Sequence, residues 1–407
     1  MRQPFDPGHP ALPQKSGVGL TLWSQMSPRL FDLTEAQALV RDTARSYAQN
    51  TLAPVAGRLD RESLFPREQL AGLAELGLMG VNVPERYGGA EAGAVAYAVA
   101  MMEIAQACAS TAVTMAVNNL VAETIVRFGT EEQKQRYVPE ITSGRFVAAS
   151  FGLSEPHAGS DAGALHTTAR KDGSDYVING TKQWITSGDQ AGVIIVWART
   201  GKPGTKGISA FLVEGGSKGL HVGRHEEKMG LRASGTVSLS FEDVRVPASA
   251  MLGPEGRGFP IALAGLDSGR VGIACQAIGI GRAALEASIR YAKDRKAFGQ
   301  PIASYQAIQF MLADVATELD AATLLALRAA GLKEAGQPFT REGSMAKVFA
   351  SEKANRACDV AVQIHGGYGY IDEFPVERHY RDVRITTIYE GSSEIQRIVI
   401  ARNVLSW

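Results

Sequence analysis

Residues 388–397 read Ile-Tyr-Glu-Gly-Ser-Ser-Glu-Ile-Gln-Arg, and the interpretation of the whole chain starts from this stretch. It sets one carboxylate, Glu390, between the aromatic Tyr389 and the flexible Gly391. A carboxyl group that is shielded from water has a raised pKa and is a better base, so Glu390 is a candidate general base beside an apolar substrate. Alone, the pattern is compatible with the commoner alternative, a loop that ends at a helix N-terminus.

The sequence around this stretch has a helical hydrophobic period from Phe259 onward. We expect helices at 259–294, 304–335, 341–365 and 391–405, separated by Gly299-Gln300-Pro301, Gly336-Gln337-Pro338 and Gly366-Gly367. Long helices with short connections favour an antiparallel four-helix bundle. The pair Ser344 and Lys347 has the spacing of penicillin-recognising enzymes, but the accompanying Lys-Thr-Gly and Ser-Asp-Asn triplets are absent.

Residues 146–258 have a strand-like pattern instead. Short apolar runs at 146–149, 193–197 and 208–213 accompany an alternating segment at 237–242. A further run, 176–178, lies between Asp172-Gly173 and Asn179-Gly180, two dipeptides that are typical of hairpin turns. Several short strands within about a hundred residues favour an antiparallel β-barrel or sandwich.

The N-terminal part is helical again after an extension rich in proline. Thr34 and Gln37 match a capping box, and 94–128 predicts one or two long helices. Residues 1–27 carry four spaced prolines and lack the apolar core of a signal peptide, so we expect a flexible extension. The sequence therefore predicts a multi-domain α+β protein with an N-terminal helical domain (28–145), a middle β-domain (146–258) and a C-terminal helical bundle (259–407).

Composition excludes several classes of function. The 42 Lys and Arg residues balance 42 Asp and Glu residues without blocks of like charge, which argues against nucleic-acid binding. The longest uncharged run, 104–122, contains too many polar groups for a membrane span. Three scattered cysteines and seven unclustered histidines predict neither a disulfide framework nor a metal site. No targeting signal decides the location, for which we expect a bacterial cytoplasm, with the mitochondrial matrix as the alternative.

Two loops of the β-region are candidates for binding a flat polar ring. Residues 151–161, Phe-Gly-Leu-Ser-Glu-Pro-His-Ala-Gly-Ser-Asp, offer backbone N–H groups and hydroxyls next to a strand. Residues 179–188 contain Trp184, a stacking surface, and Thr186, whose hydroxyl points the same way if the segment is extended. Each loop alone is more often a structural turn, but together they have what a flavin needs.

These motifs resemble those of the acyl-CoA dehydrogenase family from about residue 30 to the C-terminus. Seven motifs occur in the family's order: LSEPHAGSD (153–161), NGTKQWITSG (179–188), KMGLRAS (228–234), LDSGR (266–270), YAKDRKAFGQPI (291–302), AVQIHGGYGY (361–370) and ERHYRDVRITTIYEGSSEIQR (377–397). The sequence as a whole is most similar to the short-chain, butyryl-CoA dehydrogenase-like branch. The resemblance implies the same order of helical domain, β-domain and four-helix bundle, with FAD held between the β-domain and the bundle.

The resemblance also implies roles for particular residues. Glu390 matches the base that takes the α-proton while the β-hydride leaves for flavin N5. Contacts to FAD are implied for Phe151, Leu153, Ser154, Trp184, Thr186, Ser392 and Glu394, and substrate contacts for Ser160, Asp267, Arg270 and Gly391. A neighbouring subunit would complete the FAD site with its own copies of Arg295, Phe298, Gln306, Gln363 and Gly367. Some branches carry the base one residue before the LDSGR arginine; here that residue is Gly269, which leaves Glu390.

The implied activity is oxidation of a short- to medium-chain acyl-CoA to trans-2-enoyl-CoA, as part of fatty acid β-oxidation. The implied partners are an electron-transfer flavoprotein and further copies of the chain, in a homotetramer built as a dimer of dimers. Two alternatives stay open. One is an acyl-CoA oxidase that reduces oxygen, although such oxidases are usually longer. The other is a non-catalytic CoA-binding relative, against which the retained Glu390 argues.

Overall fold

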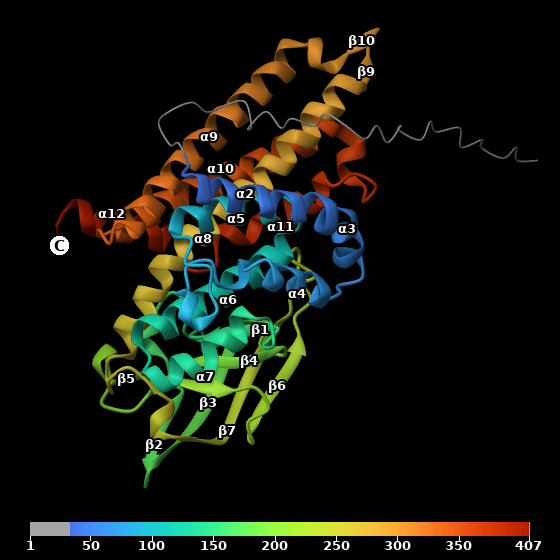
Figure 1. Ribbon diagram of the computed structural model, residues 1–407. Coiled ribbons are helices and arrows are strands. Elements are labelled where there is room, and N and C mark those ends of the chain that lie inside the picture. The colour runs from blue at the N-terminus through green and yellow to red at the C-terminus, as the bar shows by residue number, and fades with distance from the viewer. Residues whose placement is uncertain (1–32, 407) are drawn as a thin grey trace, which may run out of the picture.

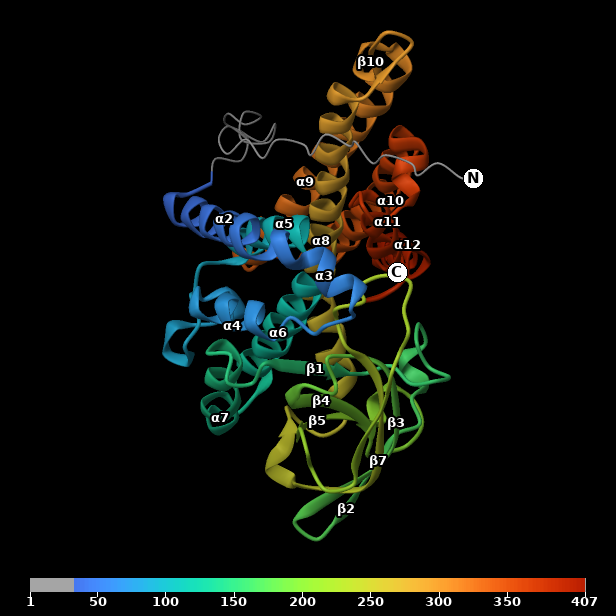
Figure 2. The same ribbon diagram turned by 90° about the vertical axis from the view of Figure 1, so that its right-hand side faces the viewer.

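The computed structural model describes residues 33–406, and the predicted extension 1–27 lies outside them. Helices form the upper part of the molecule in Figure 1, and a β-sheet forms the lower part. A single helix, α8 (Gly258–Asp294), runs from the sheet to the opposite end, where the two-residue strands β9 (Lys296–Ala297) and β10 (Gln300–Pro301) lie in both views (Figures 1 and 2). This length makes α8 the axis on which the other parts are arranged.

The N-terminal helices begin where the sequence predicts. Thr34 caps α2 (Glu35–Tyr47) in a full capping box, because its hydroxyl accepts from the Gln37 backbone and the Gln37 side chain accepts from the Thr34 backbone. The helix does not stop before Pro54, since a π-helical turn (Ala48–Leu52) leads directly into α3 (Ala53–Arg61). The remaining helices of this part are α4 (Arg67–Glu75), α5 (Ala94–Ala107), α6 (Ala109–Phe128) and α7 (Glu131–Thr142).

The sheet has eight strands in the order β6-β7-β3-β2-β4-β5-β8, with β1 beside β4. The strands are β1 (Ala148–Gly152), β2 (Thr168–Asp172), β3 (Asp175–Thr186), β4 (Ala191–Arg199), β5 (Ile208–Glu214), β6 (Leu220–His225), β7 (Thr236–Pro247) and β8 (Met251–Leu252). Most neighbours are antiparallel, as expected, but β1 and β2 both pair with β4 in parallel. The hairpin of β2 and β3 supplies the crossover between β1 and β4 that a parallel pair requires.

The dipeptide Asn179-Gly180 is not a turn, so the second of the two predicted turn signals is wrong. Strand β3 continues through it, and a β-bulge there shifts the register against β7. Asn179 exchanges hydrogen bonds of 2.9 Å with the backbone and side chain of Asp243 across the two strands. Asparagine side chains often stabilise turns, but here the Asn179 side chain forms hydrogen bonds to the neighbouring strand and stabilises a β-bulge instead.

The C-terminal part consists of α8 with α9 (Gln306–Glu334), α10 (Thr340–His365), α11 (Val376–Val383) and α12 (Ser393–Val404). One apolar core joins α8, α9, α10 and α11 to α2 and α5, and a second core joins α6 and α7 to the inner face of the sheet. The predicted order of helices, sheet and helices is therefore confirmed. Among residues 33–406, no helix is long and apolar enough to cross a membrane.

Candidate active site

Glu390 lies in a tight turn that precedes α12. Its φ is +51° and that of Gly391 is +92°, so two successive residues are in the left-handed region. For a residue with a side chain this conformation costs about 1–3 kcal/mol and persists only where neighbours fix it. Two side chains do so here. Gln396 Nε2 donates to the carbonyl oxygens of Glu390 and Gly391 at 3.2 and 2.9 Å, and Lys347 Nζ donates to that of Gly391 at 2.8 Å.

The Glu390 carboxylate is aimed at helix α8. Its Oε2 atom is buried without a hydrogen-bond partner. A Cβ atom added to Gly269 would lie 1.9 Å from this oxygen, so Glu390 occupies the space that any side chain at 269 would need. The two positions available to a base are mutually exclusive in this chain. Gly269 is therefore required for Glu390 to lie where it does.

Burial sets the protonation of Glu390. Desolvation raises the pKa of the carboxyl to about 7, and the positive charges of Lys347 and Arg270 oppose that rise. Arg270 is itself buried and pairs with Asp267 at 2.5 Å, while Thr340 donates to the other Asp267 oxygen at 2.7 Å. Of the two predicted substrate contacts, Arg270 thus lies close enough to Glu390 to act on its charge, and Asp267 is bonded to Arg270. A group with a pKa near neutral pH can accept a proton from substrate and release it again.

Small residues form one face of α8 beside this carboxylate. Gly265, Ser268, Gly269 and Gly272 are spaced as neighbours on a helix surface. An added Cβ on Gly272 would lie 2.6 Å from the Tyr97 hydroxyl. One helical turn further, the buried Gln276 accepts a hydrogen bond from the Tyr389 hydroxyl and donates to the carbonyl oxygen of Ala109 at 2.9 Å. The small-residue face of α8 therefore ends at the hydrogen-bonded side chain of Gln276.

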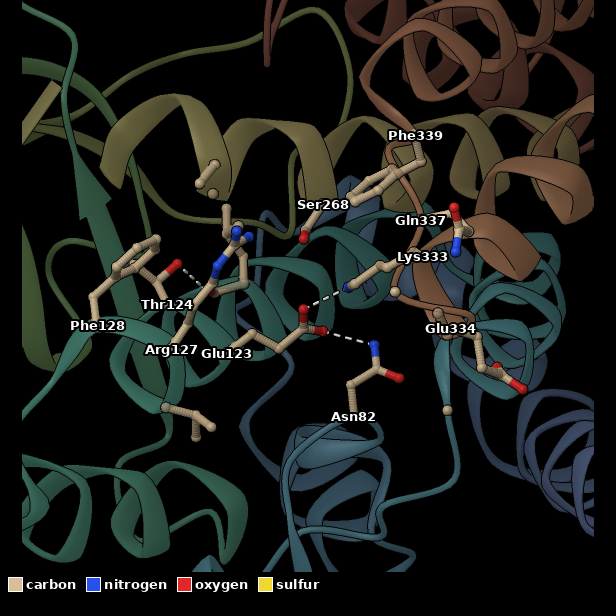
Figure 3. A pocket seen from close by; sticks show the side chains of 17 residues that line it. Asn82, Glu123, Thr124, Arg127, Phe128, Ser268, Lys333, Glu334, Gln337 and Phe339 are labelled. Atoms are coloured by element: carbon tan, nitrogen blue, oxygen red, sulfur yellow. Dashed lines mark hydrogen bonds and ion pairs between the residues drawn. The ribbon is translucent and has the colours of Figure 1, made fainter. Parts of the chain in front are cut away.

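A cavity of about 480 Å³ opens on the same face of α8 (Figure 3). Its walls come from α6, from Gly265 and Ser268 of α8, and from the connection between α9 and α10 that contains Phe339. Glu123 lines the cavity. Its carboxylate forms an ion pair with Lys333 at 2.5 Å and accepts a hydrogen bond from the Asn82 amide at 2.7 Å. Glu390 does not line this cavity, but Gly269, which it contacts, directly follows Ser268.

The two candidate flavin loops lie side by side. The Gln183 backbone N–H donates to the carbonyl oxygen of Ser154 at 2.9 Å, and the Ser150 hydroxyl donates to that of Thr186 at 2.7 Å. Trp184 has a φ of +62° at an irregularity of β3, so the segment is not extended as the prediction for Trp184 and Thr186 assumed. The bulge leaves the Trp184 side chain 62% exposed.

This surface fits a flavin. An exposed indole next to backbone polar groups and hydroxyls suits a planar ring with a polar edge. Phe151 at the end of β1 packs on Trp197 and approaches α8, where an added Cβ on Gly265 would lie 3.1 Å from its ring. The predicted flavin contacts of the β-domain thus meet the helix face that leads to Glu390. These residues could hold the ring at one end of that face.

A buried ion pair fixes the first loop. Lys182 and Glu155 lie 2.8 Å apart with side chains at most 1% exposed, and Lys182 Nζ also donates to the carbonyl oxygen of Leu153 at 3.2 Å. The other donors to Glu155 are the backbone N–H groups of His166 and Thr167. A fully bonded buried pair of this kind makes the loop rigid before any ligand binds.

We expect Lys182→Met to destabilise the protein and weaken flavin retention. Removing one member of a buried pair leaves the other charge uncompensated and costs about 3–5 kcal/mol. Thermal unfolding and the ratio of flavin to protein after gel filtration measure the two effects. Lys171→Met, an exposed lysine of β2, is the matched control. Unchanged flavin content in the Lys182 variant would contradict this role of the pair.

The residues predicted to serve a neighbouring subunit lie far from Glu390 in their own chain. Arg295 follows α8, and the helical rise of about 1.5 Å per residue sets it roughly 39 Å from Gly269. Phe298 is 97% exposed at the tip, and Arg295 stacks on Tyr368 at 5.6 Å. Arg295 and Gly367 line a second cavity of about 460 Å³. Gln306 and Gln363 are exposed on α9 and α10. Arg295 therefore cannot contact Glu390 of the same chain.

The other predicted residues lie at surface positions. Ser160 is exposed in the loop between β1 and β2. Ser392 is the N-cap of α12, and the exposed Glu394 is in its first turn. A hydrogen bond from Ser392 lowers the pKa of Glu394. Their proposed contacts to substrate and FAD stay predictions.

Sequence reasoning missed Lys347, Gln276 and Tyr97. The spacing from Ser344 is the only sequence pattern that includes Lys347, and it does not indicate a bond to the turn of Glu390. A lysine at a position with helical apolar spacing was the available signal, because Lys347 is fully buried. Gln276 similarly interrupts the apolar pattern of α8.

Comparison with known proteins agrees with this geometry. Models described as acyl-CoA dehydrogenase N-terminal, middle and C-terminal domains match residues 34–145, 150–244 and 256–405. The chain is 51% identical over 376 residues to the mitochondrial short-chain specific acyl-CoA dehydrogenase of Bos taurus, covering 92% of this chain and 91% of the relative.

Two solved structures extend the comparison. Butyryl-CoA dehydrogenase from Megasphaera elsdenii matches with a TM-score of 0.90 and 41% identity, covering 92% of this chain and 99% of that one. A chain from a structure described as the electron transferring flavoprotein of Acidaminococcus fermentans matches with a TM-score of 0.91 and 44% identity, at the same coverage.

Fold, site and similarity together define an oxidoreductase that uses FAD. The chain belongs to the acyl-CoA dehydrogenase family, with close similarity to its short-chain members. The expectation of an enzyme is thereby confirmed. The domain limits and the individual site residues stay predictions.

Proposed function

We propose that the protein oxidises a short-chain saturated acyl-CoA to trans-2-enoyl-CoA, with Glu390 as the base. The observation that supports this most strongly is the Glu390 Oε2 atom, which is buried beside Gly269 without a hydrogen-bond partner. Glu390 accepts the α-proton, and bound FAD supplies the acceptor for the β-hydride, so two hydrogens leave and one C=C bond forms. The Glu390 backbone N–H, with help from FAD, would polarise the thioester carbonyl and make the α-proton more acidic.

The substrate would lie along the small-residue face of α8. The cavity between α6 and α8 gives access to this face at Gly265 and Ser268. The glycines of α8 allow the side chains of Phe151, Glu390 and Tyr97 to approach the helix closely, and the acyl chain would lie against these side chains. Asp267 and Arg270 stabilise the helix turn under the thioester by their ion pair. Exclusion of water by the surrounding side chains strengthens each of these interactions.

The end of this face favours a short acyl group. Tyr97 stands over Gly272, and Gln276 is bonded to both Tyr389 and Ala109, so extension beyond Gly272 would require breaking buried hydrogen bonds. Leaving a buried polar group unpaired costs about 1–3 kcal/mol. Initial rates with saturated substrates from butyryl-CoA to palmitoyl-CoA test this proposal. We expect the highest kcat/KM for butyryl-CoA, and a maximum at palmitoyl-CoA would contradict it.

We expect Gln276→Ala to shift the preference toward longer chains. The change removes the barrier side chain, and each further methylene then gains about 0.8 kcal/mol by burial. The measurement is the ratio of kcat/KM for octanoyl-CoA to that for butyryl-CoA, which should rise at least severalfold. The neighbouring Cys275→Ala variant, also buried in α8, is the control. An unchanged ratio would show that Gln276 does not limit chain length.

We further propose that the electrons pass to an electron-transfer flavoprotein, as in the dehydrogenase branch of the family. Similarity to a chain from the electron transferring flavoprotein structure supports this acceptor. Slow reoxidation by air and fast reoxidation by the flavoprotein would distinguish it from oxygen. The separation of roughly 39 Å between Arg295 and Gly269 in one chain supports an assembly in which a second copy completes each FAD site. A homotetramer and a bacterial cytoplasmic location, with the mitochondrial matrix as the alternative, stay predictions.

A further inference from the structure

Lys347 has no part in the chemistry described so far, yet its position is unusual. It lies on α10 with its side chain fully buried, among the largest fully buried side chains of the described residues. Burying an ammonium group is costly unless it is bonded or paired. The hydrogen bond that Lys347 makes runs to a neutral carbonyl oxygen, that of Gly391, at 2.8 Å. The free-energy cost of burying the Lys347 ammonium group is therefore associated with a contact to the turn that contains Glu390.

The charges around Glu390 come from two helices. Lys347 of α10 and Arg270 of α8 both favour the ionised carboxylate. Arg270 is already paired with Asp267 at 2.5 Å, whereas Lys347 donates to an uncharged group. Tyr97 of α5 and the adjacent Tyr389 are buried phenols whose pKa values are raised by burial, so they stay neutral. Lys347 thus contributes most of the uncompensated positive charge next to the base.

Other groups act on Lys347 itself. Burial lowers the pKa of its ammonium to about 8, and Glu390, Glu394 of α12 and Glu352 of α10 oppose this, while Arg270 adds to it. Glu394 is exposed, and Glu352 pairs with Arg397 at 2.7 Å, so solvent and that pairing weaken both effects. At neutral pH the charge on Lys347 therefore responds chiefly to burial and to Glu390.

We propose that Lys347 is a positioning residue for the base: its hydrogen bond to Gly391 holds the left-handed turn, and its positive charge favours the carboxylate form of Glu390 over the protonated form. The inference rests on the proposed role of Glu390. It makes α10, whose other predicted role is the FAD contact of Gln363 to a neighbouring subunit, part of the machinery that prepares the base.

Gln396 provides a matched comparison within the same turn. Its amide donates to the same Gly391 carbonyl at 2.9 Å and to that of Glu390 at 3.2 Å, and it is fully buried as well. It carries no charge. Loss of Gln396 therefore removes geometric support alone, whereas loss of Lys347 removes support and charge together.

The test is a pH titration of Glu390 in the FAD-loaded protein. The infrared carboxyl band that disappears in Glu390→Gln reports its protonation without any substrate. In Lys347→Met we expect the midpoint to rise by about one pH unit or more, because the neighbouring charge is lost. Lys347→Arg and Gln396→Leu should keep the wild-type midpoint. Flavin bleaching by butyryl-CoA should become about tenfold slower in Lys347→Met below the midpoint, with its acid limb moved to the same extent.

Three results would overturn the proposal: an unchanged midpoint in Lys347→Met, a rise of a full unit in Lys347→Arg, or a rise in Gln396→Leu as large as that in Lys347→Met. The Arg and Leu variants decide the matter even if Lys347→Met does not retain flavin. Failure of the dehydrogenase function itself would be separate, since wild-type protein would then not bleach with any acyl-CoA while the infrared titration still reports on Lys347.

Discussion

Glu390→Gln should retain FAD and bind acyl-CoA but lose turnover. The amide has nearly the shape of the carboxyl group and fits the same space over Gly269, so the site stays intact. It cannot accept the α-proton. General-base catalysis contributes about 10²–10⁴-fold to a reaction rate. We expect a loss of rate at the upper end of this range, because the α-C–H is a far weaker acid than a carboxyl group and does not lose its proton without a base. Stopped-flow bleaching of the flavin band by butyryl-CoA measures the loss.

Thermal unfolding is the control measurement for Glu390→Gln, because it shows whether the variant is folded. Burial raises the pKa of Glu390 from 4.5 to about 7, so the folded state favours the protonated form. The stabilising contribution is complete below the unfolded pKa of about 4.5 and is lost as the pH rises through about 7. A permanently neutral Gln should therefore unfold at a higher temperature than wild type at pH about 8. Full bleaching by the variant would show that Glu390 is not the base.

Gly269→Ala should have the second-largest effect. The added Cβ would lie 1.9 Å from Glu390 Oε2, so the carboxylate must move by about an ångström or more. A misplacement of about 1 Å can cost roughly 10²-fold in rate. Alanine favours a helix over glycine by about 1 kcal/mol, which offsets part of the strain, so the protein should still fold and bind FAD. Single-turnover bleaching with butyryl-CoA measures the rate.

Gly343→Ala is the matched control, because it also changes a buried glycine inside a helix of the same region. Its added Cβ would meet its nearest atom, the Asp267 carbonyl oxygen, at an ordinary 3.6 Å. This variant should keep nearly the wild-type rate. Equal rates for the two variants would contradict the close approach of Glu390 to Gly269.

The parts of the fold that were predictable depend on local signals. The capping box of Thr34 and Gln37 fixes the start of α2, and the Gly and Pro residues around 299–301 and 336–338 separate long helices at nearly the predicted limits. These features depend on neighbours within a few residues, which a sequence displays directly.

Features that depend on distant partners were not predictable from pattern alone. Asn179-Gly180 has the composition of a turn, and only Asp243 on the opposite strand makes it a bulge. Trp184 adopts a left-handed conformation that no propensity indicates. Lys347 becomes significant only because α10 folds against a turn 44 residues away in sequence. The sequence could mark Glu390 as a candidate base, but the side chains that contact its turn come from α10 and α12.

The central claim is that Glu390 removes the α-proton of an acyl-CoA, and one measurement tests it most directly. Anaerobic bleaching of the wild-type flavin by α-deuterated butyryl-CoA is followed across a range of pH from about 5.5 to about 8.5. The account predicts a primary isotope effect and a rate that rises through pH about 7, as the carboxyl group loses its proton. A rate that is independent both of pH and of deuterium at the α-carbon would contradict it.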